Sequence, residues 1–395
     1  MKIAIITVNF VGSSSSLAEA FLSCGHDVDF YNVVFTSQHN IEFESLTLPY
    51  IPHGLGLHEL TEFDTDGLKR FKQYSNHLHF FNAICLGYPK NKGITTQVKG
   101  YVSGLFQRFV FRAFRNKEYE LVNVIGQSSF AVSLSLLFKK WNLPVCHSFH
   151  EVLSNHLKGK QLYSGVDAII EKGIKINLFS EKSALDLKNH VCLSSKQLSV
   201  IPFGLFTGFQ EYSVVDVLEI ADIKDYVLFY GYIEKYKGLD VLYEASKKLN
   251  NSDIKIVVAG RGYQPVLESM RSDGRFILIN RWLGNSELIT LICKSKFIVC
   301  PYLSASQSGI PQTVFNFGKP IVATDIESFQ EVIVQNANGL IVESNNINEL
   351  AGAINRMYLD EELYNKMVSN IKLYRTSTAK DEWAKIVSKY IDLVY

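Results

Sequence analysis

The chain has 395 residues, of which 47% are hydrophobic and 20% charged, and these proportions exclude a disordered or fibrous protein. This length exceeds what one hydrophobic core of ordinary size serves, so we expect two domains. The 40 lysines and arginines balance the 39 aspartates and glutamates, which leaves no overall field that would attract nucleic acid.

The six cysteines are scattered, and none is part of a C-x-x-C pair, so we expect no zinc site. Several lie in apolar runs, as reduced thiols of a cytoplasmic protein do. No apolar run reaches the roughly 18–20 residues of a membrane span. The apolar segment 2–8 lacks a small-residue cleavage site, and we interpret it as a strand rather than a signal peptide.

Strand and helix patterns alternate from residue 2 onward. The β-branched run 2–8 predicts a strand buried on both faces. A loop of small residues, a helix ending near Gly25 and a strand at 26–34 follow, and this succession opens a doubly wound parallel sheet. Further strands are predicted at 81–89, 119–126, 143–149, 175–180 and 198–204, with a helix at 130–142.

A second cycle begins near residue 226, after a stretch at 205–225 that has no steady strand period. It contains predicted strands at 226–233, 254–260, 275–281, 296–302, 319–325 and 338–344, and helices at 237–249, 286–295, 346–360, 361–374 and 381–395. We expect a first domain at 1–208, a second at 209–378, and a terminal helix at 379–395 that packs back on the first domain.

Ligands of open parallel sheets bind at the carboxyl ends of the strands, so residues that follow strands are site candidates. Gly231 ends a strand, and Lys235 and Lys237 lie in the loop before the next helix. Cations and free backbone amides at a helix start suit a diphosphate. A solvated loop that contains lysines is the plain alternative.

Glycines and small polar residues follow two further strands. Gly260 and Gly262 flank Arg261, so a ligand can approach the backbone there, although a tight turn explains these glycines equally well. A later run of small polar residues offers hydroxyl and amide donors to a phosphate, although serine N-caps are common. The run contains Ser304, Ser306, Gln307, Ser308 and Gly309, and precedes a predicted helix that runs to Gly318.

In this order, the motifs resemble those of the retaining glycosyltransferases of family 4. The resemblance covers most of the chain, is strongest over 226–345, and implies the GT-B architecture, in which two Rossmann-like doubly wound α/β domains face a cleft. It is closest to a bacterial subgroup that makes surface polysaccharides. The segments that match this subgroup are Ile-Glu-Lys-Tyr-Lys-Gly at 233–238, Ile-Asn-Arg at 279–281 and Ala-Ser-Gln-Ser-Gly at 305–309.

The resemblance implies a UDP- or GDP-linked sugar donor bound to the second domain, with no further cofactor. Lys235 and Lys237 would contact its diphosphate. Ser308 and Gly309 would present amides to phosphate or sugar. The remaining donor-side candidates are Gly231, Gly260, Arg261, Asn280, Ser306, Gln307, Thr313 and Glu331.

His150 matches the first-domain histidine of the family and is the candidate catalytic residue, with His147 as its neighbour and rival. The chain departs from the family where two glutamates are usual, because Ala305 and Thr313 occupy those positions. A lost charged hydrogen bond costs roughly 1.5–3 kcal/mol, so the departure puts the strength of activity in doubt. Tyr232 likewise replaces a basic residue, and Lys235 is its candidate substitute.

Charge develops on the diphosphate as the glycosidic bond breaks, and lysines with backbone amides can stabilise it without a metal ion. We therefore expect no metal. The Asp64-Thr65-Asp66 sequence resembles a metal-binding D-x-D motif, but its polar surroundings favour a helix cap.

The first domain is expected to bind the acceptor. Gly12 and Ser13 lie in a loop at the mouth of the first strand, where a flexible helix cap is the alternative. A helix over 99–117 would group Arg108, Arg112 and Arg115 on one side, apart from Phe106, Phe109 and Ala113. This pattern suits docking on an anionic membrane, although a core helix with an arginine-rich exposed face explains it as well.

The sequence thus predicts a cytoplasmic enzyme that extends a saccharide acceptor, lipid-linked in our interpretation, during capsule, O-antigen or exopolysaccharide synthesis. The inner face of the cytoplasmic membrane is its candidate location. Two alternatives stay open. One is a GT-B nucleotide-sugar epimerase, which would turn over its substrate without an acceptor. The other is a non-catalytic nucleotide-sugar-binding protein, which the two missing glutamates motivate.

Overall fold

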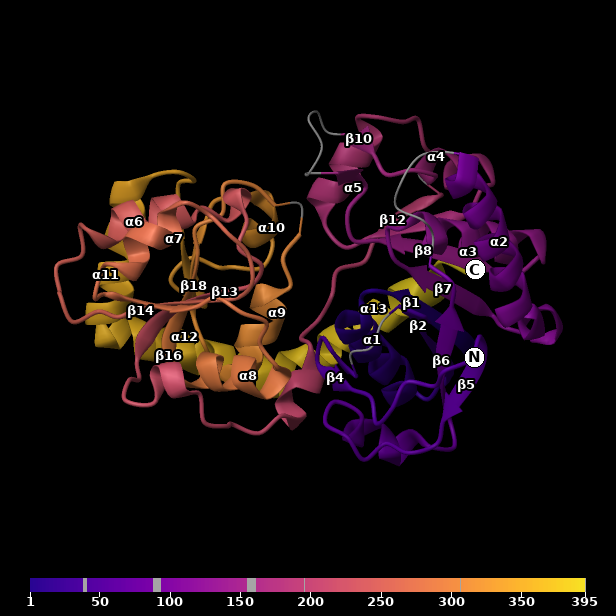
Figure 1. The fold of residues 1–395 in the computed structure, drawn as a ribbon, viewed down its shortest axis with the longest axis horizontal. Coiled ribbons are helices and arrows are strands. Elements are labelled where there is room, and N and C mark those ends of the chain that lie inside the picture. The colour runs from indigo at the N-terminus through magenta and orange to yellow at the C-terminus, as the bar shows by residue number, and fades with distance from the viewer. Residues whose placement is uncertain (38–40, 88–93, 155–160, 195, 306, 395) are drawn as a thin grey trace. The chain divides into compact units, whose positions relative to one another are not determined.

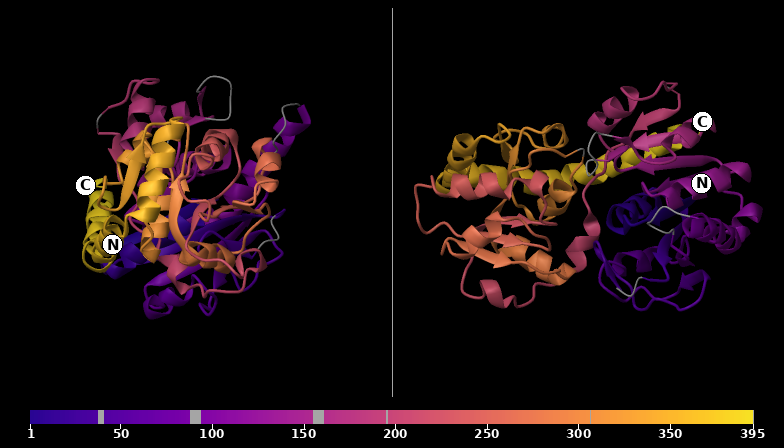
Figure 2. Two further views of the ribbon diagram at one scale, coloured as in Figure 1. Left: turned by 90° about the vertical axis from the view of Figure 1, so that its left-hand side faces the viewer. Right: turned by 45° about the horizontal axis from the view of Figure 1, so that its top comes forward.

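The computed structural model describes residues 1–37, 41–87, 94–154, 161–194, 196–305 and 307–394. It divides into two compact units, the first formed by Met1–Glu211 with Asp381–Tyr395 and the second by Tyr212–Lys380 (Figure 1). The sequence placed these limits at 208/209 and 378/379. Figure 2 shows that the strands of each unit are flanked by helices.

The first unit is built on an eight-stranded sheet in the order β12-β11-β8-β7-β1-β2-β6-β5. Its strands pair in parallel, except for β5, which runs antiparallel to β6 at the edge. The strands are β1 (Lys2–Val8), β2 (Asp27–Phe35), β5 (Gly56–Leu60), β6 (Leu78–Cys85), β7 (Leu121–Ile125), β8 (Val145–Phe149), β11 (Lys175–Leu178) and β12 (Leu198–Val200). Two short hairpins lie outside the sheet: β3 (Glu42–Phe43) with β4 (Leu46–Thr47), and β9 (Leu153–Ser154) with β10 (Gln161–Leu162).

Helices cover this sheet because β1, β7 and β8 are buried along nearly their whole length. They are α1 (Val11–Ser23), α2 (Ile94–Val110), α3 (Ser129–Lys140), α4 (Val166–Glu171), α5 (Glu181–Lys188) and α13 (Ala379–Asp392), with 3-10 helices η1 (Lys69–Tyr74), η2 (Arg112–Asn116) and η3 (Thr207–Glu211). Two expectations were wrong. Residues 12–16 belong to α1 rather than to a loop, and the helix expected over 99–117 breaks after Val110 into the separate 3-10 helix η2.

The body of α13 packs against the first unit. The Trp383 indole nitrogen donates a hydrogen bond to the Leu205 carbonyl at 3.2 Å. The side-chain nitrogen of Asn177, Nδ2, donates one to the Tyr390 hydroxyl at 2.9 Å. Gly204 lies so close to Trp383 that a Cβ there would come within 2.6 Å of the indole. Buried polar and aromatic contacts therefore tie the last helix to the sheet.

The second unit contains a six-stranded parallel sheet in the order β15-β14-β13-β16-β17-β18. Its strands are β13 (Tyr226–Tyr230), β14 (Ile256–Ala259), β15 (Phe276–Ile279), β16 (Ser295–Cys300), β17 (Ile321–Thr324) and β18 (Gly339–Val342). Its helices are α6 (Leu239–Ser246), α7 (Val266–Arg271), α8 (Asn285–Lys294), α9 (Ile310–Val314), α10 (Glu327–Gln330), α11 (Ile347–Leu359) and α12 (Glu361–Leu373), with short helices η4 (Leu218–Ile220), η5 (Lys235–Lys237), η6 (Phe315–Phe317) and η7 (Tyr374–Thr378).

Each sheet reverses its winding beside its first strand. In the first unit the chain winds outward from β1 through β2 and later returns to β7 on the other side of β1. In the second unit it winds from β13 to β14 and β15, and β16 then pairs with the free side of β13. Such reversals separate the loops at the carboxyl ends of neighbouring strands, and ligands bind there.

Candidate functional site

Loops from three strands meet at the reversal point of the second unit. Gly231 follows β13, and its amide donates to the Ala259 carbonyl at the end of β14 at 3.0 Å. The Ile233 amide donates to the Arg261 carbonyl at 2.8 Å, and the Leu303 amide, beyond β16, donates to the Tyr236 carbonyl at 2.7 Å. The loops after β13, β14 and β16 therefore form one hydrogen-bonded surface.

Lys237 is the cation at the centre of this surface. Its side chain is buried, and Nζ donates a hydrogen bond to the Tyr302 hydroxyl at 2.9 Å while lying 4.7 Å from the centroid of the same ring. Nζ also lies beside Gly231, where a Cβ would come within 3.1 Å of it. Burial lowers the pKa of Lys237 from its ordinary value. In the described parts of the chain, no carboxylate forms an ion pair with Lys237.

Gly260 lets the neighbouring loops approach each other. It adopts φ 142°, in a region that L side chains rarely enter, and a Cβ there would lie 2.0 Å from the Gly231 carbonyl oxygen. Gly238 is constrained in the same way, since its Cβ would lie 1.9 Å from the Pro301 carbonyl oxygen. These glycines set the spacing of the strand ends around Lys237.

A short helix follows the polar run after β16, where the sequence predicted a helix as far as Gly318. The α-helical part covers only Ile310–Val314, and a 3-10 turn continues it to Phe317. Ser308 Oγ accepts a weak hydrogen bond from the Ile310 amide at 3.4 Å, and Gly309 is the residue before the helix. Gln307 is half-buried, and Ser306 lies outside the described residues.

Thr313 and Ala305 stand where the sequence resemblance implied two glutamates. Thr313 is buried, and its hydroxyl donates to the Gly309 carbonyl at 3.0 Å, so this proton is already used within the helix. The Ala305 carbonyl accepts from the Ser328 hydroxyl at 3.3 Å. A ligand hydroxyl at this place meets a neutral oxygen rather than a carboxylate.

Four donor-side candidates are exposed around the same edge: Lys235, Arg261, Asn280 and Glu331. Lys235 and Lys237 both lie in η5, but only Lys237 is buried. Asn280 directly follows β15, and Glu331 follows α10. The loop geometry brings Gly231, Lys237, Gly260 and Arg261 together. Tyr302 was missed by the sequence analysis, although it lies two residues after β16, and position after a strand is the same signal that selected its neighbours.

His150 lies at the carboxyl edge of the first sheet, directly after β8. Its ring stacks on Phe10, which follows β1, with centroids 3.6 Å apart and planes inclined by 14°. The rings of Phe179 and Phe203 lie at 4.9 and 5.3 Å, and they follow β11 and β12. The candidate catalytic histidine is thus surrounded by aromatic rings that the sequence analysis did not select.

His147 is a core residue, which separates it from His150. Its Nδ1 forms a hydrogen bond with Ser135 Oγ at 2.7 Å, and its Nε2 with the Gly126 carbonyl at 2.8 Å. Burial lowers its pKa to about 4, so the imidazole is neutral near pH 7. Its two ring nitrogens are used in holding β8 to α3 and β7.

Gly12 and Ser13 are buried in the first turn of α1. A Cβ on Gly12 would lie 2.9 Å from Glu44, and the Ser13 hydroxyl donates to the Phe10 carbonyl at 3.3 Å. The expected open loop is therefore wrong, because the serines satisfy the first backbone carbonyls of the helix. Gly12 and Ser13 offer less free surface to an acceptor than the sequence indicated.

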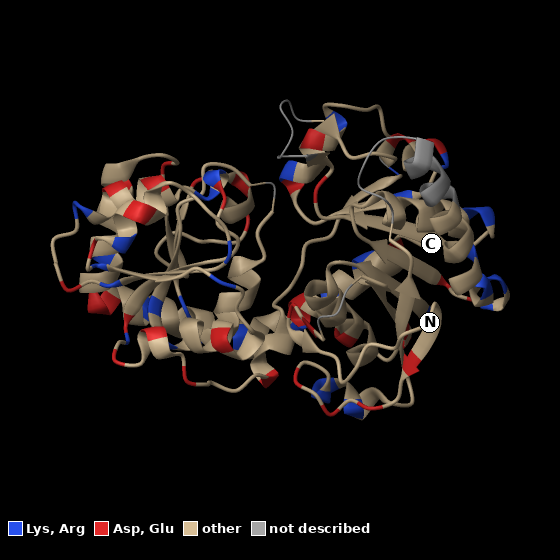
Figure 3. Cartoon of the chain, viewed as in Figure 1, with Lys and Arg blue, Asp and Glu red and all other residues tan. Residues whose placement is uncertain are grey.

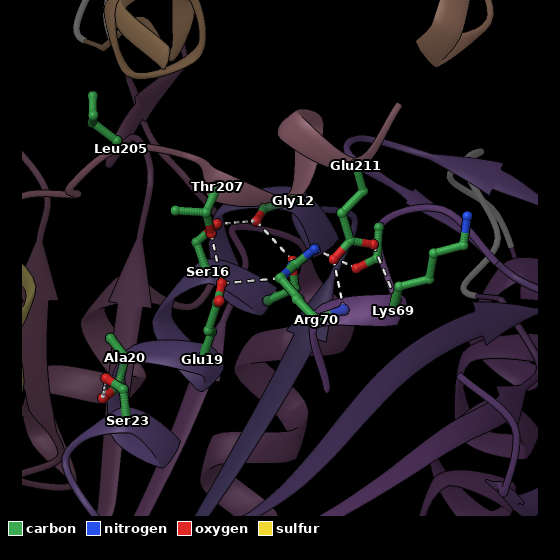
Figure 4. Close-up of polar contacts among 12 residues, drawn as sticks. Gly12, Ser16, Glu19, Ala20, Ser23, Lys69, Arg70, Leu205, Thr207 and Glu211 are labelled. Carbon is green, nitrogen blue, oxygen red and sulfur yellow. Dashed lines mark hydrogen bonds and ion pairs between the residues drawn. The ribbon is translucent and has the colours of Figure 1, made fainter. Parts of the chain in front are cut away.

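Arg70 joins α1 to the segment that leaves the first unit (Figure 4). Its Nε lies 3.0 Å from Glu19 Oε2, and the same carboxylate oxygen accepts from the Thr207 hydroxyl at 2.6 Å. The backbone amides of Lys69 and Arg70 donate to Glu211 at 3.0 and 2.6 Å. This network fixes residues 207–211 on the surface of the unit.

The Asp64-Thr65-Asp66 sequence pairs with lysines of η1. Asp66 forms an ion pair with Lys69 at 2.5 Å, and Asp64 pairs with Lys72. Leu68, which precedes η1, makes no side-chain capping hydrogen bond, and the helix cap expected from the Asp64-Thr65-Asp66 sequence stays a prediction. Within the described ranges, no group of three or more histidine, cysteine, aspartate or glutamate side chains is placed to hold a metal ion.

The arginines of α2 and η2 lie beside exposed apolar side chains, and Figure 3 shows basic segments at the end of α2 and over η2. Arg108, Arg112 and Arg115 are all exposed. The apolar members of this surface are Val102, Leu105, Phe106 and Phe109, which are 38, 45, 37 and 50% exposed. The expected segregation of arginine and phenylalanine is wrong, because Arg112 lies 4.9 Å from the centroid of the Phe109 ring.

A cavity of about 270 Å³ borders this surface between α2 and α3, and both Arg108 and Lys140 line it. None of the described helices is long and apolar enough to cross a membrane. The thiols of Cys85, Cys146 and Cys300 are buried as expected for apolar runs, whereas those of Cys24 and Cys192 are exposed.

Residues 214–374 match the family Glycosyl transferases group 1. An uncharacterized glycosyltransferase of Methanocaldococcus jannaschii is 23% identical over 64% of this chain and 68% of its own length. A 41.2 kDa protein in the cps region of Klebsiella pneumoniae is 22% identical over 61% of this chain and 62% of its own. The Anabaena protein HepE, solved with UDP and glucose, superposes with a TM-score of 0.63 at 12% identity, covering 99% of both chains.

The fold and these matches define a GT-B glycosyltransferase, which confirms the fold class and the enzyme class that the motifs predicted. The residues that match the group 1 glycosyl transferases, 214–374, make up most of the second unit.

Proposed function

We propose that this glycosyltransferase moves a sugar, with retention of configuration, from a UDP- or GDP-linked donor to a hydroxyl group of a saccharide acceptor. The observation that carries the proposal is Lys237, a buried cation at the reversal point of the second sheet that is hydrogen-bonded to a neutral phenol. A buried ammonium without a counter-ion is costly, and a diphosphate is the anion that such a place in the fold binds.

The leaving nucleoside diphosphate gains negative charge as the glycosidic bond breaks. In the proposed mechanism, Lys237 meets this charge from a buried position, where screening by water is weak. A Cβ at Gly231 would lie 3.1 Å from Lys237 Nζ, so the glycine leaves this ammonium uncovered on that side for a phosphate. His150 of the first unit is assigned to the transferred sugar, and the acceptor hydroxyl attacks the anomeric carbon from the face that the diphosphate leaves.

The nucleotide side is assigned to Gly260, Arg261 and Asn280, and the phosphate and sugar side to the polar run after β16. The neutral Thr313 supports a donor grip that is weaker than a carboxylate would give, since a hydrogen bond between neutral groups contributes about half as much as a charged one. In this proposal the cationic charge comes from lysine rather than from a metal ion.

The acceptor is proposed to be a lipid-linked saccharide of surface polysaccharide synthesis. The cps-region relative of Klebsiella pneumoniae supports this pathway. The surface formed by Val102, Leu105, Phe106, Phe109 and the arginines of α2 and η2 supports peripheral contact with the inner face of the cytoplasmic membrane. Among the described residues, no carboxylate pairs with Arg108, Arg112 or Arg115, so their charge is available to anionic lipid.

The test is a thermal-shift titration of the full chain with UDP, GDP and other nucleoside diphosphates. A ligand of the folded state raises the melting temperature by mass action. We expect UDP or GDP to stabilise the wild type and Lys237→Ala to weaken this binding about 10- to 100-fold, because a charged hydrogen bond contributes roughly 1.5–3 kcal/mol. Lys247→Ala, at an exposed lysine after α6 of the same unit, is the matched control and should leave the affinity within about twofold of the wild type.

Lack of any shift in the wild type would contradict the donor assignment. Sugar transfer from a sugar nucleotide of the stabilising base to an added acceptor then distinguishes the alternatives. Turnover of the nucleotide sugar without an acceptor would favour an epimerase, and binding without turnover would favour a non-catalytic protein.

A further inference from the structure

The ring of Phe10 covers one face of the His150 imidazole. The centroids are 3.6 Å apart and the planes are inclined by only 14°, so the two rings are in direct stacked contact. Both side chains are half-buried, which leaves part of the pair open at the carboxyl edge of the first sheet. The two residues are 140 positions apart in sequence and meet because β1 and β8 flank β7.

Two further rings restrict the pair. Phe179 and Phe203 stack on each other with centroids 3.8 Å apart, and each also contacts His150. Both of these rings are buried, at 4 and 6% exposure. Phe179 and Phe203 therefore contact His150 from the buried side of this group of four rings, whereas Phe10 contacts it from the half-exposed side.

The backbone before Phe10 is shaped for this contact. Asn9 adopts φ 72°, in the left-handed region that asparagine tolerates better than most residues. The turn ends β1 and places Phe10 at the residue that precedes α1. An unusual backbone conformation that is kept at the mouth of a sheet often serves the geometry of a site.

We propose that Phe10 is a positioning residue, whose ring holds the imidazole plane of His150 in the orientation that acts on the transferred sugar. The inference rests on the proposed function, in which His150 is the catalytic residue. The torsion that rotates a histidine ring has a broad energy profile, so a neighbour must fix the plane. Small misplacements of a reacting group lower turnover strongly.

The stacking is tested first by NMR of the full chain with labelled histidines. The ring current of Phe10 should move the His150 ring protons upfield, and Phe10→Leu should remove most of this shift while Phe10→Tyr retains it. Assignment uses His150→Ala, which deletes the corresponding signal. If the His150 signals are the same in Phe10→Leu and wild type, the stacking and the inference are both wrong.

Turnover is tested by release of the nucleoside diphosphate as the sugar passes from a sugar nucleotide, of the base that stabilises the wild type, to a hydroxyl of an added saccharide acceptor. Phe10→Leu should lower kcat between about tenfold and about 100-fold, leave the donor KM within about twofold, and be rescued by Phe10→Tyr. Phe81→Leu is the matched control, because Phe81 is also half-buried and stacks on Tyr31 at 4.9 Å, far along the chain from His150.

The two assignments fail in different ways. Wild-type kcat in His150→Ala would overturn the catalytic role of His150, and this inference with it. Wild-type kcat in Phe10→Leu together with an inactive His150→Ala would overturn the inference alone. An equal loss in Phe10→Leu and Phe10→Tyr would also overturn it, because the aromatic ring would then not be the active feature.

Discussion

The two sheets of this glycosyltransferase reverse their winding in the same way, but the side chains at the two reversal points differ in kind. At the edge of the second sheet, which we call the glycine edge, the glycines Gly231 and Gly260 and the buried Lys237 surround a polar surface. At the edge of the first sheet, which we call the aromatic edge, Phe10, Phe179 and Phe203 enclose His150. The parallel sheet supplies the location in both units, and the side chains after its strands decide between binding an anion and orienting a ring.

Removal of the histidine from the aromatic edge is expected to have the largest effect on turnover. His150→Ala should lower turnover by about 100-fold or more, the usual contribution of a positioned acid–base group, without changing nucleotide affinity. Steady-state kinetics and thermal shift measure the two quantities. His147→Ala should instead keep its turnover and lose about 1–3 kcal/mol of stability, because the hydrogen bonds to Ser135 and Gly126 are removed. If both variants keep full turnover, the aromatic edge has no catalytic role.

The glycine edge is tested by adding one methyl group. Gly260→Ala should destabilise the second unit by about 1–3 kcal/mol from backbone strain alone, with a further cost from its contact with Gly231. Gly274→Ala is the matched control, since nothing lies within 4 Å of its added Cβ. Chemical denaturation measures both. Equal stability of the two variants would show that close approach of the loops is not required.

The pH dependence of nucleotide binding sharpens the role of the buried cation. Because burial lowers the pKa of Lys237, its ammonium form is lost below the ordinary value of 10.5. In that window the unfolded chain binds more protons than the folded one, so this group makes stability rise with pH. Diphosphate affinity should instead fall as pH rises through the lowered pKa.

Lys237→Arg stays charged throughout this range and should show a flatter pH profile of affinity. Both proteins share the ionisation of the nucleotide base, so the difference between their profiles isolates the lysine. Isothermal titration calorimetry at several pH values measures it. Superimposable profiles would contradict a contact between Lys237 and the diphosphate.

The smallest expected effect concerns the membrane surface. Arg112→Gln should weaken binding to vesicles of phosphatidylglycerol about fivefold, since a basic residue near an anionic surface contributes about 1 kcal/mol. Vesicle co-sedimentation at low salt measures this. Lys385→Gln, a charge change on α13, should have no effect, and equal losses in the two variants would indicate attraction by net charge only.

Much of the fold was predictable, because buried parallel strands such as β1, β13 and β14 read as continuous apolar runs. The edge strand β5 was missed, since its sequence GLHEL is only partly apolar and its residues are mostly half-buried. The break between α2 and η2 was also missed, because helical spacing continues through it while the backbone does not.

The glycine edge was largely predictable, because Gly231, Lys237 and Gly260 each directly follow or closely trail a strand. The aromatic edge was not. Phe10 resembles any apolar residue between a strand and a helix, and its contact with His150 depends on the order of strands in space. Sequence spacing reports neighbours along the chain, whereas stacking at 3.6 Å depends on which strands pair.

The attachment of α13 to the first sheet has a consequence for biosynthesis. Tyr390 contacts Phe21 and accepts a hydrogen bond from Asn177, so residues near position 390 complete a core that begins at residue 3. A ribosome makes the whole second unit before it delivers this helix, and domains generally fold in the order of their synthesis. The first unit must therefore wait, with the surface that Trp383 and Tyr390 cover still exposed, until the second unit has been synthesised.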